Sequence, residues 1–433
     1  MTTALIGFAV VLLLCFFGVR VGFATLFVGV AGFALQRGFG AALTMTGSQI
    51  IETATNYNLS IIPLFVLMGA FIYRADISSD LYEAAHARLG HLRGGLAQST
   101  VLACAAFSAV CGSSLATAAT MTRVALPSMR AYRYSDRLAT GTIAAGGTLG
   151  IMIPPSVPLV IYGIIAEQDI GTLFIAGIVP GLLLVTAFLL TVAIWTTLNP
   201  DAGPARTGAA AARKRGAGGS VIAVLLLFVF VLGGIYASIF TPTEAAGIGA
   251  TGAAAIAFAR GSLRSLSVWV EILVEAAVTT AALFMIIFGT LVFAQFINLS
   301  GMPFDLMFLV EDMGLSPLGL VASIALIALL LGMIFESLGI LLLIVPVFLP
   351  ALIAADVDLI WFGIIVVMVT ELGLITPPIG MNVFVVRSVM PDVRLASIFV
   401  GVMPFVAALI AVLVLILLFP AIATVLPDFA NTP

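Results

Sequence analysis

Long apolar segments follow one another along almost the whole chain and are separated by short polar stretches. About 20 consecutive apolar residues are enough to cross the hydrocarbon core of a bilayer as an α-helix. The first segment is divided at Arg20, which predicts two short helices in place of one. The predicted segments are 3–36, 58–73, 96–127, 138–165, 172–198, 220–238, 243–259, 272–297, 316–352, 361–386 and 395–426. This pattern is typical of an all-α polytopic membrane protein.

The composition is also typical of an integral membrane protein, because 62% of the 433 residues are hydrophobic and only 9% are charged. The three cysteines all lie in apolar segments, so no disulfide or metal framework is indicated. The sequence contains neither a phosphate-binding loop ending in Lys-Ser/Thr nor a His-Glu-x-x-His motif. We therefore expect no enzyme activity and no nucleic-acid partner.

Ten residues at 149–158 recur in altered form at 372–381, an offset of 223 positions. Each copy contains a Pro-Pro pair inside an apolar segment, and Pro breaks a helix by removing a backbone donor. The same offset relates further pairs, namely Ser114 with Ser337, Pro127 with Pro350 and Gly150 with Gly373. A register kept from 114 to 158 argues against chance similarity. Paired interrupted spans in two halves point to the binding site of a secondary transporter.

Charge placement indicates how the two halves are oriented. Basic residues flank segment 96–127 on both sides, namely Arg74, Arg88, Arg93, Arg130, Arg133 and Arg137. Acidic residues flank segment 316–352 on both sides, namely Asp305, Glu311, Asp312, Asp356 and Asp358. By the positive-inside rule, both ends of the first segment lie in the cytoplasm and both ends of the second lie outside. Each segment is thus predicted to be a re-entrant helical hairpin, and the two form an inverted-topology repeat.

The predicted organisation follows from these assignments. We expect scaffold helices at 1–75 and 220–259, a first repeat unit at 76–198, a cytoplasmic linker at 199–219 and a second repeat unit at 260–433. The units contain hairpins 96–127 and 316–352 and discontinuous helices 138–165 and 361–386. Counting crossings places both termini outside, with Arg37 as an exception to the charge rule. Stretches 76–93 and 260–275 mix charged and apolar residues, so they are either interfacial helices that join a fixed part to a moving part or ordinary loops.

The hairpin tips carry the polar groups of the two halves. The first tip is predicted near Cys111-Gly-Ser-Ser-Leu-Ala-Thr117 and the second near Phe335-Glu-Ser-Leu-Gly339. A helix broken by Pro leaves carbonyl oxygens free, and hard cations such as Na⁺ take these oxygens and Ser/Thr hydroxyls as ligands. The amides at opposing half-helix ends favour a carboxylate. Each half thus offers a cation site, with an anion site between them. The alternative is that Ser and Thr only pack helices together.

Two carboxylates in apolar surroundings, and a third at a predicted helix start, have different interpretations. Glu336 and Glu371 can each bind a cation, carry a proton or pair with a base such as Arg123. A structural role is favoured for Glu371. Glu244 follows Thr241 by three residues at the start of a predicted helix, and this spacing favours a capping role.

Five motifs in order resemble the large membrane subunit (DctM type) of tripartite ATP-independent periplasmic (TRAP) transporters. They are Pro63-Leu-Phe-Val-Leu-Met-Gly69, Gly112-Ser-Ser-Leu-Ala-Thr117, Gly150-Ile-Met-Ile-Pro-Pro-Ser156, Phe240-Thr-Pro-Thr-Glu-Ala-Ala246 and Gly373-Leu-Ile-Thr-Pro-Pro-Ile-Gly-Met-Asn382. The resemblance covers nearly the whole chain. It implies a sodium-driven importer of organic acids, such as C4-dicarboxylates or sialic acid, in the bacterial inner membrane. It also implies a transport domain that slides against a scaffold as an elevator.

The resemblance further implies partners and site residues. One partner is a small membrane subunit of four helices, expected here as a separate chain, and the other is a soluble periplasmic substrate-binding protein. The implied Na⁺ ligands are Ser113, Ser114, Gly147, Gly150 and Ile153 in one half and Ser337, Gly373, Thr376 and Met381 in the other. The expected substrate-contacting residues are Thr117, Pro154, Pro155, Ser156, Gly339, Pro377, Pro378 and Asn382, with Glu336 nearby.

Two other functions are weighed against this one. A self-sufficient Na⁺/dicarboxylate symporter would share the inverted hairpins but would need no small subunit. An integral-membrane hydrolase using Ser114 or Glu336 would need a paired base or a metal ligand, and the sequence shows neither.

Overall fold

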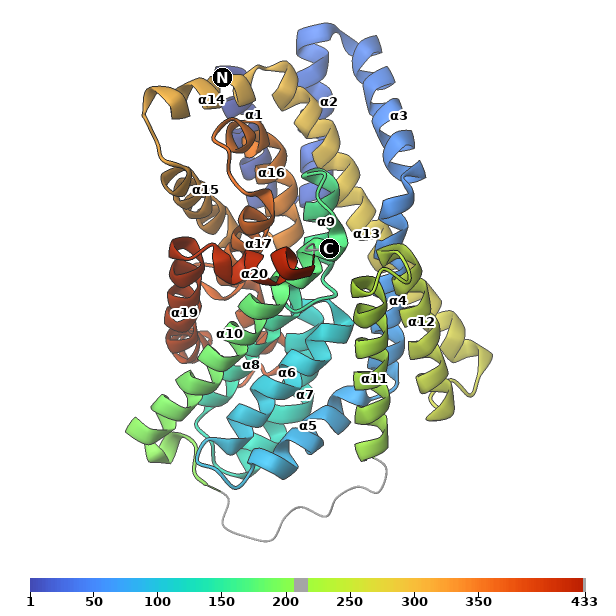
Figure 1. Ribbon diagram of the computed structural model, residues 1–433, viewed down its shortest axis with the longest axis vertical. Coiled ribbons are helices and arrows are strands. Elements are labelled where there is room, and N and C mark those ends of the chain that lie inside the picture. The colour runs from blue at the N-terminus through green and yellow to red at the C-terminus, as the bar shows by residue number, and fades with distance from the viewer. Residues whose placement is uncertain (206–216, 431–433) are drawn as a thin grey trace.

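The computed structural model describes residues 1–205 and 217–430, and these residues fold almost entirely into α-helices (Figure 1). Within them, five helices are long and apolar enough to cross a membrane, or six when one bent helix pair counts as one span. Several shorter apolar helices accompany them. The prediction of an all-α polytopic membrane protein is therefore confirmed at this level.

Apart from α3, the helices of the first half of the chain follow the predicted segments. They are α1 (Thr2–Phe16), α2 (Val21–Arg37), α3 (Phe39–Thr55), α4 (Ile61–Arg74), α5 (Ile77–Leu89), α6 (Gly95–Cys111), α7 (Ser114–Ala131), α8 (Asp136–Met152), α9 (Val157–Ile165) and α10 (Ile170–Leu198). The first segment is divided at Arg20, as predicted, and the amphipathic stretch 76–93 forms helix α5.

The second half continues in the same way. Its helices are α11 (Ala217–Tyr236), α12 (Pro242–Ala259), α13 (Leu266–Leu299), α14 (Met302–Asp312), α15 (Pro317–Gly332), α16 (Ser337–Ala354), α17 (Leu359–Ile375), α18 (Met381–Val389), α19 (Leu395–Leu418) and α20 (Ala421–Ala430). The basic residues of the predicted linker 199–219, Arg206, Arg213, Lys214 and Arg215, lie outside the described residues.

Four local predictions were wrong. Helix α3 is absent from the predicted segments, and α14 occupies a stretch expected to be a loop. The stretch 260–275, expected to be either an interfacial helix or a loop, is neither, because most of it belongs to the continuous helix α13. The expected single segment 395–426 is two helices separated at Pro420, where Pro removes a helical donor.

Helix α3 escaped prediction because its polar side chains lower its apolar character without preventing helix formation. The hydroxyls of Thr46 and Thr53 donate to carbonyl oxygens four residues before them, at 2.7 and 2.6 Å. Such bonds satisfy the hydroxyls inside the helix. Gln49 also accepts a hydrogen bond of 3.0 Å from Gln295 of α13, so α3 is joined to the longest helix of the molecule.

Both predicted hairpin segments break at the predicted tips. Helices α6 and α7 are separated by Gly112 and Ser113, and they pack against each other. Gly112 has a φ of +62°, in the left-handed region that favours Gly. Helices α15 and α16 are separated by a turn at 333–336 and also pack together. From which membrane face each hairpin enters stays a prediction.

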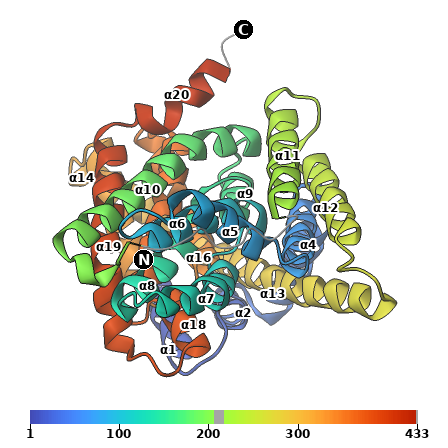
Figure 2. The same cartoon turned by 90° about the horizontal axis from the view of Figure 1, so that it is seen from below.

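Both predicted discontinuous helices break at their Pro-Pro pairs. Helices α8 and α9 are bent by 40° at the first pair, and helices α17 and α18 are separated by the second. The two halves interlock at these breaks, since α9 packs on α16 and α17 while α18 packs on α7 and α8 (Figure 2). Each broken helix therefore ends within the opposite half of the chain.

Helices from the predicted scaffold lie at one side of the molecule, where α11 and α12 stand beside α4 (Figures 1 and 2). Helix α13 crosses behind them and packs against both α2 and α4. Helices α2 and α13 come into close backbone contact at Gly22 and Gly289, where an added Cβ on Gly289 would lie 2.0 Å from the Gly22 carbonyl oxygen. Helix α14 lies at one end of the molecule and α5 at the other (Figure 1).

Candidate functional site

The two hairpin tips meet at one small cavity of about 90 Å³. Residues from both tips, both broken helices and two further helices line it together. They are Cys111, Gly112, Ser113, Ser114 and Leu115 of the first tip, Glu336, Ser337 and Leu338 of the second, and Val66, Ile151, Val157, Pro158, Leu283 and Leu374. Val66 belongs to α4 and Leu283 to α13, so helices outside the hairpins form part of the wall.

The first tip presents a hydroxyl that its own helix does not use. Ser113 is the N-cap of α7, and its Oγ accepts a 3.4 Å hydrogen bond from the Ala116 amide. Ser114 follows as the first residue of α7 and is only 4% exposed. Its side chain lines the cavity and has no hydrogen-bond partner among the described residues. A buried hydroxyl without a partner is suited to a ligand that supplies one.

Glycines bring the first broken helix against this tip. A Cβ added to Gly147 would lie 3.1 Å from the Ser114 carbonyl oxygen, and one on Gly150 would lie 3.4 Å from the Ser113 carbonyl carbon. The lack of a side chain at both positions makes room for this approach. The predicted set Ser113, Ser114, Gly147 and Gly150 is therefore together in space. The Ile153 side chain, in contrast, lies against Gly181 of α10.

The second predicted cation set is more dispersed. Ser337 is the first residue of α16, is 6% exposed and lines the cavity. Gly373 packs against the end of α15, because an added Cβ would lie 2.5 Å from the Gly332 carbonyl carbon. The Thr376 hydroxyl donates to the Leu372 carbonyl oxygen at 2.6 Å. Met381 begins α18 and does not line the cavity.

None of the predicted substrate residues lines the cavity. The Thr117 hydroxyl donates to the Ser113 carbonyl oxygen at 2.8 Å, and Ser156 caps α9 while donating to the Ile151 carbonyl oxygen. Gly339 lies against Val21 of α2. Pro154 and Pro155 are buried, whereas Pro377 and Pro378 are exposed. The breaks in the two halves thus have opposite exposure in this structure.

Asn382 connects the two halves directly. Its Nδ2 donates a 3.1 Å hydrogen bond to the Ala144 carbonyl oxygen of α8, and the residue is fully buried. Its Oδ1 has no partner among the described residues. An acceptor oxygen beside Gly147 and the first tip can bind a donor group or a cation.

The two intramembrane carboxylates occupy different places. Glu336 lines the cavity as the N-cap of α16 but makes no side-chain capping bond. Glu371 lies in α17, is fully buried, and its carboxylate oxygens accept no hydrogen bond from the described residues. Arg123 is exposed on α7 and forms no ion pair with either group within the described part of the chain. The predicted capping box of Thr241 and Glu244 is present at the start of α12.

The electrostatics of the cavity suit both a cation and an anion. Helices α7 and α16 both begin at its wall, and free amides at helix N-termini favour negative charge. Hydroxyl and carbonyl oxygens of the first tip favour a hard cation. Sequence reasoning missed Val66 and Leu283, since apolar residues in long apolar segments give no signal of such a role. It found the tips because polar residues and Gly interrupt those segments.

Comparison with known proteins identifies the family. A sequence model described as the DctM component of the tripartite ATP-independent periplasmic transporter matches residues 8–422. The C4-dicarboxylate TRAP transporter large permease protein DctM of Pseudomonas aeruginosa is 37% identical, with 88% of each chain covered. The sialic acid TRAP transporter large permease protein SiaM of Vibrio cholerae is 33% identical, with 96% of each chain covered.

A solved transporter structure shows the same fold. The YdaH transporter of Alcanivorax borkumensis superposes with a TM-score of 0.68 at 12% identity, covering 92% of this chain and 90% of that one. The relatives are named as permease proteins of transporters, which agrees with the multi-pass helical structure and is a non-enzymatic role. The chain therefore belongs to the DctM family, the large membrane permease component of tripartite ATP-independent periplasmic transporters.

Proposed function

We propose that this chain is the transport subunit of a Na⁺-coupled, binding-protein-dependent importer of organic acids. The observation that supports this most strongly is the cavity shared by the tips of α6–α7 and α15–α16. Helices α7 and α16 begin at its wall with Ser114 and Ser337, whose buried hydroxyls have no partner among the described residues. Carboxylates such as C4-dicarboxylates or sialic acid, which the relatives' names specify, carry the charge that helix N-termini favour.

The proposed movement is an elevator. The hairpins and broken helices move as one domain, carrying the cavity along the fixed helices at 1–75 and 220–259. Support comes from the cavity wall, in which only Val66 and Leu283 lie outside the hairpins and broken helices. A solute bound in the cavity would then cross the membrane together with the sliding domain, and the packed interior of that domain would not have to open. Helix α5 is suited to join the two parts, because it follows α4 and packs against α6.

The proposed setting is the bacterial inner membrane, with both termini in the periplasm. Na⁺ is the transported coupling ion. The proposed partners are a small membrane subunit of four helices and a soluble periplasmic protein that captures the solute. The loops expected outside are acidic at Glu167, Asp169, Asp356 and Asp358, and acidic loops repel an organic anion. A receptor that binds the anion beforehand overcomes this repulsion.

Reconstitution tests the proposal. We expect this chain alone, in liposomes with an inward Na⁺ gradient, to accumulate no labelled succinate or sialic acid. Uptake should require the small membrane subunit and the loaded binding protein encoded beside it. A K⁺ gradient of equal size is the control for ionic strength. Robust uptake by the single chain would favour a self-sufficient symporter, and uptake that ignores Na⁺ would contradict the coupling.

A further inference from the structure

The cavity between the tips contains one carboxylate and no base. Its lining residues, all within the described part of the chain, include no Lys, Arg or His. Glu336 is the only acid among them. It precedes α16 as the N-cap, yet its carboxylate forms no capping bond. The Glu336 carboxylate also forms no ion pair or hydrogen bond with any other residue that the structure describes. The Glu336 carboxylate therefore neither caps the helix nor pairs with another side chain, which are the usual structural roles of such a group.

A carboxylate in such a place either binds a proton or stays ionised beside a partner of opposite charge. The wall of the cavity is mostly apolar, and an unpaired charge in apolar surroundings is strongly unfavourable. An organic anion cannot be that partner, because like charges repel each other more strongly away from water. A cation that binds beside Glu336 cancels its charge and leaves the two helix N-termini free to attract the anion.

The neighbouring donors indicate which cation fits. Ser337 follows Glu336 directly, and Ser114 of the other tip lines the same cavity. Both residues are more than nine-tenths buried, and neither hydroxyl has a partner among the described residues. Carboxylate and hydroxyl oxygens are ligands for a hard metal cation. The described residues contain no group of three or more His, Cys, Asp or Glu placed so that it could hold a metal ion, which argues against a transition metal.

We propose that Glu336 is the charged ligand of a monovalent metal cation bound between the two tips. The inference rests on the proposed function in taking this cation to be Na⁺. It adds a carboxylate ligand at the shared cavity to the hydroxyl and backbone ligands expected within each half. It also explains how a cavity containing a carboxylate accepts an organic anion.

Direct binding of Na⁺ to the purified full chain in lipid nanodiscs tests the assignment without any solute. The melting temperature is measured as NaCl replaces choline chloride at constant ionic strength. We expect Na⁺ to stabilise the wild-type chain, and Glu336→Gln to raise the half-maximal Na⁺ concentration at least tenfold. Glu336→Asp keeps the charge and should shift it less. Glu311→Gln, on the exposed end of α14, is the matched control and should shift nothing.

The outcomes separate this inference from the proposed function. A wild-type response to Na⁺ that Glu336→Gln keeps unchanged overturns the inference alone. No response of the wild-type chain to Na⁺ overturns both. If Glu336→Gln does not fold, a Glu336→Asp chain that folds and shows the wild-type midpoint also overturns the inference, since the shorter side chain withdraws the ligand.

Discussion

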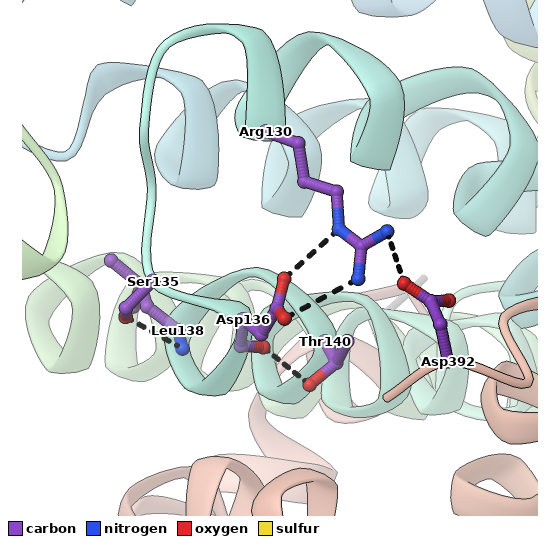
Figure 3. A network of polar contacts seen from close by, with 6 residues as sticks. All are labelled: Arg130, Ser135, Asp136, Leu138, Thr140 and Asp392. Carbon is purple, nitrogen blue, oxygen red and sulfur yellow. Dashed lines mark hydrogen bonds and ion pairs between the residues drawn. The ribbon is translucent and has the colours of Figure 1, made fainter. Parts of the chain in front are cut away.

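Arg130 Nη1 lies 2.7 Å from Asp392 Oδ2, and this pair joins the end of α7 to the loop between α18 and α19 (Figure 3). The same guanidinium donates from Nε to Asp136 Oδ1 at 3.0 Å and from Nη2 to Asp136 Oδ2 at 3.3 Å. One side chain thus connects the first hairpin, the start of α8 and the exit from the second broken helix. Because α18 already packs on α7 and α8, the network fastens an existing contact between the two halves.

We expect Arg130→Gln to lower the melting temperature modestly, since all three side chains are partly exposed and exposed ion pairs contribute little. The exchanged pair Arg130→Asp with Asp392→Arg should recover part of the loss. Arg137→Gln, on the exposed start of α8, removes a charge outside the network and is the control. Thermal unfolding at low and high salt measures the effect. A wild-type advantage that does not shrink in high salt would contradict an electrostatic origin.

The same network predicts a pH dependence. The hydrogen bond from Arg130 holds the pKa of Asp392 below its ordinary value. A carboxylate with a lowered pKa stabilises the fold above its ordinary pKa, and this stabilisation is lost as the pH falls through the lowered value. We expect Asp392→Asn to melt below the wild type at pH 7. The difference should shrink as the pH falls below the ordinary pKa of Asp, and the two should converge only when the pH falls below the lowered pKa of Asp392. A difference that stays constant down to that pH would show that the charge of Asp392 is not involved.

Close backbone contact between α8 and α19 predicts another sensitive position. A Cβ added to Gly141 would lie 2.1 Å from the Gly401 carbonyl oxygen, and neither backbone can move without shifting its helix. Overpacking of this kind costs about 1–3 kcal/mol. Gly141→Ala should therefore lower the melting temperature. In Gly233→Ala an added Cβ meets nothing within 4 Å, so this variant should melt like the wild type. Equal melting temperatures of the two variants would mean that α8 and α19 can move apart to accommodate a methyl group at little cost in stability.

Much of the fold follows from where the apolar pattern is interrupted. Gly112 and the neighbouring serines mark the first tip, and the Pro-Pro pairs mark both broken helices, because these residues change what the backbone can do. Helix α3 was missed because its Thr and Gln side chains make its sequence less apolar. In the structure these side chains form hydrogen bonds within α3 and with α13. Helix α14 was taken for a loop for a similar reason, because three acidic residues in its short sequence interrupt the apolar pattern.

The site was less predictable than the fold. Ser114 and Ser337 lie at matched sequence positions, and the structure brings both to one cavity. Gly373, Thr376 and Met381 were expected beside Ser337 but lie outside the cavity wall. Their contacts with Gly332 and Leu372 depend on how α17 packs, and packing between distant apolar helices leaves no periodic signal in the sequence.

The inverted-topology hypothesis predicts opposite accessibility for the ends of the two hairpins. Single cysteines replace Arg93, Arg137, Asp312 or Ala354, which are exposed in the structure, in a chain whose own three cysteines are changed to Ala. An impermeant thiol reagent applied to intact cells with a permeable outer membrane should label Asp312→Cys and Ala354→Cys. Arg93→Cys and Arg137→Cys should react only after lysis. Labelling of all four from outside would contradict the re-entrant hairpins.

The buried hydroxyls of the tips predict how uptake depends on Na⁺. If Ser114 and Ser337 bind the coupling ion, each change to Ala removes one ligand oxygen without altering the helix that bears it. The loss should be about 1–3 kcal/mol, the penalty for a lost buried polar contact. At about 1.4 kcal/mol per tenfold, this raises the half-maximal Na⁺ concentration for uptake roughly 5- to 150-fold. The measurement is initial uptake by the complete tripartite transporter across a series of Na⁺ concentrations. Ser323→Ala is the control, because the Ser323 hydroxyl donates to the Gly319 carbonyl oxygen of its own helix at 2.7 Å. If both tip variants keep the wild-type Na⁺ curve, these two serines do not bind the coupling ion, and their hydroxyls serve the solute or the packing of the tips.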